Sequence, residues 1–144
     1  MGIRNFVTFD AEFPDDSQWD EQGNLLIPGG KNIAEFFRRQ LQEKGFSCSD
    51  TSQHSHYGWA FDAVSEKIQV WCLLQTYDTW LLILEQKKSI VHRLFGSHNN
   101  SSFDVFQDKI QEILTMDRRF SKVLWYTRGD FESGKVQCGS PMPR

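Results

Sequence analysis

The chain has 144 residues, which is the size of one domain, and a chain of this length buries enough surface to fold without disulfides or a structural metal. Its formal net charge of −3 argues against the broad basic face expected of a nucleic-acid-binding protein. The longest apolar run, Trp80 to Leu84, is far shorter than a membrane span of roughly 20 residues. The first residues lack the pattern of a signal peptide. We therefore expect a cytoplasmic protein that contacts neither membrane nor nucleic acid.

The N-terminal third alternates between extended and helical patterns. Residues 3–13 alternate as a strand does, and an acidic loop and a short extended piece at 24–27 follow. Pro28-Gly29-Gly30 interrupts the pattern before a helix predicted over 32–44, with Gly45 at its left-handed C-cap. The apolar stripe of this helix is Ile33, Phe36, Phe37 and Leu41.

The remainder reads as a sheet followed by a helix and one more strand. Residues 46–48 predict a short strand, and 57–64, 68–75 and 80–85 predict three strands joined by short turns, which favours an antiparallel meander. Residues 90–95 are either a fourth strand or the approach to a helix that begins at Ser101 or Ser102. Its apolar stripe is Phe103, Phe106, Ile110, Ile113 and Leu114, and a last strand is predicted over 122–127.

These elements predict a single α+β domain, with an antiparallel sheet of about five strands and two main helices. The domain is expected to occupy residues 1–128. Residues 129–144 are polar and rich in Gly and Pro, so we expect a flexible C-terminal tail.

The three cysteines, Cys48, Cys72 and Cys138, are odd in number and form no CxxC pair. This argues against a disulfide framework and favours free thiols.

Two groups of residues could bind a metal ion. His54 and His56 would point the same way in an extended chain, but no spacing ties them to His92, His98, Cys48 or Asp62. Asp10 and Glu12 share one face of the first predicted strand, and Asp62 lies in another, so a metal-dependent hydrolase is an alternative. Solvated polar surface is the commoner explanation of both groups, and we expect no metal site.

Motifs for other chemistry are missing from the sequence. Pro28-Gly29-Gly30-Lys31 lacks the spacing of a P-loop, and no GxSxG motif surrounds a serine. Basic residues gather only at Lys87, Lys88, His92 and Arg93 and at Arg118, Arg119 and Lys122. The sequence predicts neither an enzyme nor a cofactor.

Negative charge is concentrated at the start of the chain. Residues 1–21 hold six acids and one base, a formal −5, and the remaining 123 residues carry a formal +2. An acidic segment with an aromatic residue inside it can attract and hold a basic protein surface, although a solvated acidic loop would show the same composition. The predicted binding residues are Asp10, Glu12, Asp15, Asp16, Trp19, Asp20 and Glu21.

One stretch resembles a family of small bacterial proteins. Pro28-Gly29-Gly30-Lys31-Asn32-Ile33-Ala34, then Leu41, Gly45-Phe46 and finally Tyr57-Gly58-Trp59-Ala60-Phe61, is similar to a layout in immunity proteins of toxin systems, including contact-dependent growth inhibition. The resemblance covers residues 28–61 and carries over no catalytic residue. It implies that the chain binds and neutralises a cognate toxin, for example a nuclease with a basic cleft. An adaptor or regulatory module would share the same sequence features.

Overall fold

The computed structural model describes residues 2–55, 58–76, 79–87 and 101–144. In chain order, the elements are β1 (Arg4–Ala11), β2 (Gln18–Trp19), β3 (Leu25–Ile27), α1 (Lys31–Glu43), β4 (Ser47–Cys48), β5 (Ser52–His54), β6 (Gly58–Val64), β7 (Gln69–Thr76), β8 (Trp80–Lys87), α3 (Ser101–Met116), β9 (Phe120–Thr127), α4 (Arg128–Glu132) and the 3₁₀ turn η1 (Val136–Cys138). This arrangement confirms the α+β class.

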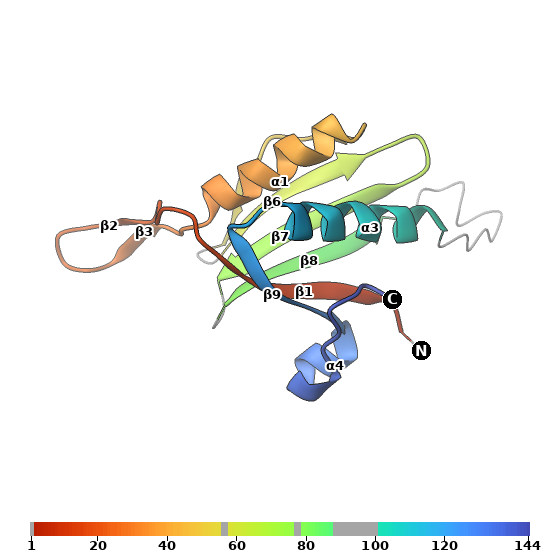
Figure 1. Ribbon diagram of the computed structural model, residues 1–144. Helices are drawn as coiled ribbons and strands as arrows, with labels where there is room; N and C mark the ends of the chain where they lie inside the picture. The colour runs from red at the N-terminus through yellow and green to blue at the C-terminus, as the bar shows by residue number, and fades with distance from the viewer. Residues whose placement is uncertain (1, 56–57, 77–78, 88–100) are drawn as a thin grey trace.

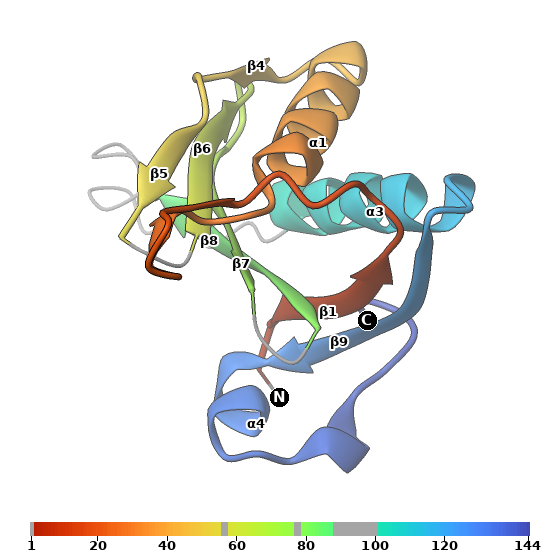
Figure 2. The ribbon, with the colours of Figure 1, turned by 90° about the vertical axis from the view of Figure 1, so that its left-hand side faces the viewer.

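The main sheet is antiparallel, with the strand order β4-β6-β7-β8-β1-β9 and β5 also paired to β6. The meander β6-β7-β8 is confirmed by continuous registers, such as Phe61 opposite Cys72 and Cys72 opposite Leu84. β1 lies between β8 and β9, which the sequence did not predict, and the described residues form a sheet of seven strands, where about five were predicted. Both α1 and α3 cover one face of this sheet (Figures 1 and 2).

The helices and the sheet enclose one core. The predicted apolar stripes of α1 and α3 lie in it, and only Phe36 among them is partly exposed. Phe37 packs between Phe9 of β1 and Phe120 of β9, with ring centroids 5.8 and 5.5 Å away. Gly45 has φ 97°, which confirms the left-handed end predicted for α1.

The second face of the sheet is partly covered by residues after 128. Phe131 of α4 packs on Phe6 and Tyr126, with centroids 5.3 and 5.8 Å away. Ser140 then pairs with Trp125 on the outer edge of β9. The predicted boundary at residue 128 therefore differs from the structure, in which residues 129–144 fold back onto the domain instead of forming a separate tail.

Two further expectations concern a strand over residues 90–95 and a membrane-spanning helix. The strand considered over residues 90–95 lies outside the described residues. Among the described helices, none is long and apolar enough to cross a membrane.

Candidate functional site

A small hairpin projects from the body of the molecule (Figure 1). It consists of β2 and β3, which pair antiparallel with Gln18 opposite Ile27 and Trp19 opposite Leu25. Strands this short are not stable alone, so the hairpin must be held by contacts at its base and at its turn.

The base of the hairpin is held by Asp16. Its two carboxylate oxygens accept hydrogen bonds from the backbone N–H groups of Gly30 and Asn32, each at 2.8 Å. The Asn32 side chain in turn donates to the Pro14 carbonyl oxygen at 2.8 Å. Gly30 has no side chain with which to cap α1, so an acid 14 residues earlier supplies the cap and fixes the loop to the helix.

The turn of the hairpin is organised by Asp20. Its carboxylate accepts hydrogen bonds from the backbone N–H groups of Gln22 and Asn24 and from the Asn24 amide. The bonds from Asn24 lower the pKa of the Asp20 carboxyl. Gly23 has φ 84°, which glycine adopts without strain.

Two large apolar side chains of this hairpin are exposed. Trp19 is 58% exposed and Leu26 is 57% exposed. Trp19 is paired with Leu25 next to a shift in the strand register, and both residues line a groove that Leu26 does not reach. The Trp19 indole N–H donates to the Ser17 hydroxyl at 3.0 Å, which orients the ring.

On the Trp19 face, the hairpin forms one wall of a groove. This hairpin groove has a volume of about 430 Å³ and is lined by Asp15, Ser17, Trp19, Leu25, Pro28, Gly29, Thr76 and Trp80. The Trp80 ring lies against Gly30, where an added Cβ would come within 2.7 Å of it. Hydrogen bonds from Ser17 lower the pKa of the Asp15 carboxyl, so this carboxylate is ionised at neutral pH.

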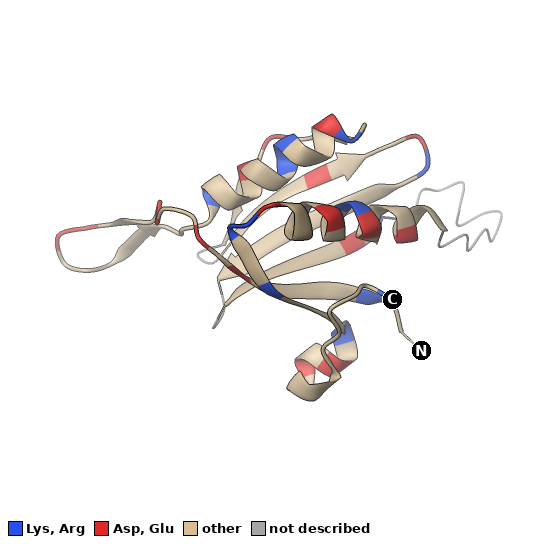
Figure 3. Cartoon of the chain, in the orientation of Figure 1, with Lys and Arg blue, Asp and Glu red and all other residues tan. Residues whose placement is uncertain are grey.

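The hairpin and the loop that leads into it carry only negative charge, and the next base along the chain is Lys31, the first residue of α1. No Lys or Arg occurs between Arg4 and Lys31. Figure 3 shows acidic positions at the tip of the hairpin and near its base, with no basic position on the hairpin. Four of the predicted binding acids, Asp15, Asp16, Asp20 and Glu21, belong to this segment, and Asp15 and Glu21 are the exposed ones.

Asp10 and Glu12 lie apart from the hairpin. Asp10 accepts a hydrogen bond from Thr79 at 2.7 Å and pairs with Lys122 at 3.5 Å, in a cavity of about 360 Å³ between the sheet and residues 134–136. The backbone N–H of Glu12 donates to the Arg119 carbonyl oxygen. The structure therefore divides the predicted binding residues between two locations.

The carboxylates of the hydrolase alternative do not meet. Asp62 pairs with Lys87 at 3.0 Å on β6, three strand spacings or about 14 Å from β1. His54 packs edge-on against Trp71 with centroids 5.3 Å apart, and His56, His92 and His98 lie outside the described residues. Within the described ranges, no group of three or more His, Cys, Asp or Glu residues could hold a metal ion.

In the two basic clusters noted in the sequence, three of the four residues that the structure describes pair with acids. Arg119 binds Asp117 at 2.8 Å and its guanidinium lies 4.1 Å from the centre of the Phe13 ring. Lys87 and Lys122 form the ion pairs described above. Lys88, His92 and Arg93 lie outside the described part of the chain.

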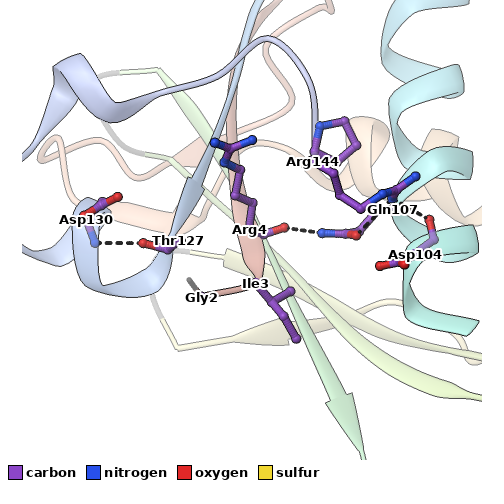
Figure 4. A pocket seen from close by; sticks show the side chains of 9 residues that line it. Gly2, Ile3, Arg4, Asp104, Gln107, Thr127, Asp130 and Arg144 are labelled. Atoms are coloured by element: carbon purple, nitrogen blue, oxygen red, sulfur yellow. Dashed lines mark hydrogen bonds between the residues drawn. The ribbon is translucent and has the colours of Figure 1, made fainter. Parts of the chain in front are cut away.

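A larger cavity, of about 520 Å³, lies where the N-terminal strand, α3 and the C-terminus meet (Figure 4). The buried amide of Gln107 donates to the Arg4 carbonyl oxygen and accepts from Arg144 at 3.3 Å. Arg144 also binds Asp108 through both carboxylate oxygens. These groups bind one another, and we assign this cavity a structural role in joining the two ends of the chain.

Comparison of the chain with protein-family models, with curated proteins and with solved structures found no match. The resemblance of residues 28–61 to immunity proteins therefore stays a prediction. The hairpin groove was missed by the sequence-based analysis, because Trp80, Pro28 and Thr76 come from segments that only the fold brings to Trp19. The isolated Trp19 within an acidic segment was the one signal that pointed there.

Proposed function

We propose that this chain acts by binding another protein through the β2–β3 hairpin and the hairpin groove. The observation that carries the proposal is the exposure of Trp19 on a projecting, exclusively acidic hairpin that is fixed at both its base and its turn. Tryptophan is among the residues that contribute most to binding at protein interfaces. A surface that is already rigid also loses less entropy on binding.

The partner that this surface suits is a basic protein. Long-range attraction between opposite charges accelerates association, and the hairpin carries no base that would oppose it. We propose that the partner is a cognate toxin in the cytoplasm and that the chain is its immunity protein. The resemblance of residues 28–61 supports this identity, and the acidic hairpin supports a toxin with a basic surface.

The test uses the purified product of the gene directly upstream, because an immunity gene should follow its toxin gene. Binding kinetics are measured at low and moderate salt for the parent chain and for a double variant, Asp15→Asn with Glu21→Gln. We expect the variant to associate several-fold more slowly at low salt and the difference to shrink as salt screens the charges. Trp19→Ala should chiefly accelerate dissociation.

Asp16 and Asp20 are left intact in this test because both hold the loop in shape. Glu66→Gln, an exposed acid in the β6–β7 turn, is the matched control and should leave both rates unchanged. Absence of binding by the upstream product would refute the toxin assignment. Binding with rates that none of the hairpin variants alter would place the interface elsewhere.

A further inference from the structure

We infer that the hairpin groove receives a lysine or arginine side chain of the partner. This inference rests on the proposed protein-binding function and specifies the chemistry of the contact. The methylene stem would lie against the Trp19 and Trp80 rings, and the cationic head would reach the Asp15 carboxylate.

The walls of the groove suit the stem and the charge of such a side chain. Trp19 and Trp80 both line it, and indole rings attract cations more strongly than other aromatic rings do. Lysine and arginine bury their aliphatic stems against apolar surface while the charged group stays at the polar edge. Leu25 and Pro28 complete the apolar lining.

The rim of the groove selects for positive charge. Asp15 is exposed, and its carboxylate is held by the backbone N–H of Ser17 at 2.9 Å, which orients it while leaving acceptor capacity. The pKa of this carboxyl is lowered, and no basic residue lines the groove to neutralise it. A hydrogen bond between an ionised donor and an ionised acceptor is about twice as strong as a neutral one.

The groove is also built to keep its shape. Asp16 binds the backbone of Gly30, which lies against the Trp80 ring, so these contacts tie the loop to the start of α1 and to the floor of the groove. The Ser17 hydroxyl accepts a hydrogen bond from the Trp19 indole N–H and fixes the orientation of that ring.

The experiment is a titration of the ¹⁵N-labelled full chain with N-acetyl-lysinamide, N-acetyl-argininamide and the uncharged N-acetyl-norleucinamide. The indole N–H resonances of Trp19 and Trp80 report on the groove, and that of Trp71 on the sheet face serves as an internal reference. We expect saturable shifts at Trp19 and Trp80 with the two cationic amides, and at least about tenfold weaker binding of the norleucine amide.

Variants separate the groove from the rest of the hairpin. Trp19→Ala should weaken binding of the cationic amides, read at Trp80, by about 2- to 30-fold, and Asp15→Asn should reduce the preference over norleucinamide. Leu26→Ala is the matched control, since Leu26 is about as exposed as Trp19 but does not line the groove, and it should change nothing. Trp19→Phe keeps an aromatic ring and should weaken binding less than Trp19→Ala does, which separates loss of the ring from a general effect of substitution at this position.

Several results would overturn the inference: no saturable shift at either indole, equal binding of norleucinamide, or equal loss in Leu26→Ala. If the amides do not bind but the partner still binds through the hairpin, only the inference of a cationic side chain in the groove is refuted. If the amides bind but substitution of Trp19 or Asp15 leaves the association and dissociation rates of the partner unchanged, the proposed interface is refuted instead.

Discussion

Single residues in the acidic segment differ in what they do, although their sequence context is similar. Asp15 lies at the edge of the groove, Asp16 caps α1 and Asp20 shapes the turn. The distinction comes from which backbone N–H groups each carboxylate faces. Because the three residues carry the same charge in the same segment, the sequence alone did not distinguish them.

Replacement of Asp16 tests this distinction. Asp16→Ala leaves the N–H groups of Gly30 and Asn32 without their acceptor, and we expect the free energy of unfolding to fall by about 0.5–2 kcal/mol. Urea unfolding followed by circular dichroism measures the change. Asp15→Asn is the control and should change the free energy by less than about 0.5 kcal/mol. Equal effects of the two substitutions would contradict the capping role.

The cysteines should also differ in reactivity. Burial raises the pKa of the Cys48 thiol to about 11, and burial also raises the pKa of the Cys72 thiol well above its ordinary value. Because the thiolate is the reactive form, iodoacetamide at pH 7.5 should label exposed Cys138 first and Cys48 slowly, with Cys48 labelling rising as the pH increases. Cys72 should react only after unfolding. Peptide mass spectrometry measures each site, and rapid native labelling of Cys72 would show that β7 opens.

At the scale of elements, α4 and η1 change the role of the C-terminal residues. The polar composition of residues 129–144 predicted a flexible tail, because no apolar periodicity marks so short a helix. Phe131 nevertheless packs on Phe6, and Gly139 lies against the Tyr126 ring. These long-range contacts explain why a polar segment is folded.

A pair of glycine substitutions examines this docking. A Cβ at Gly139 would lie 2.7 Å from the Tyr126 ring, so Gly139→Ala should destabilise the protein by about 1–3 kcal/mol. Gly129→Ala in α4 meets no atom within 4 Å and should be neutral or slightly stabilising. Thermal unfolding of both variants decides the matter. A neutral Gly139→Ala would mean that the C-terminal segment is not held against β9.

At the scale of the whole molecule, one core joins elements from both halves of the chain. Phe37 of α1 and Ile110 of α3 are fully buried in it. We expect Phe37→Ala and Ile110→Ala each to lower the free energy of unfolding by about 2–5 kcal/mol while the transition stays single. Val105→Ala, at an exposed position of α3, should cost less than about 0.5 kcal/mol. Two separate transitions in denaturant would contradict a single core.

The sequence by itself determined the features that depend on neighbouring residues. The stripes Ile33 to Leu41 and Phe103 to Leu114, the left-handed Gly45 and the β6–β7–β8 meander each follow from local periodicity or from a short turn. Backbone geometry imposes these periods within a few residues, so they can be read without knowledge of the fold.

Only the tertiary structure decided what depends on distant residues. The insertion of β1 between β8 and β9, the separation of Asp10 from the hairpin and the meeting of Trp19 with Trp80 involve partners far apart in the chain. The capping of α1 by Asp16 is of the same kind. No local pattern encodes such pairs, because they form only when burial of the shared core brings the segments together.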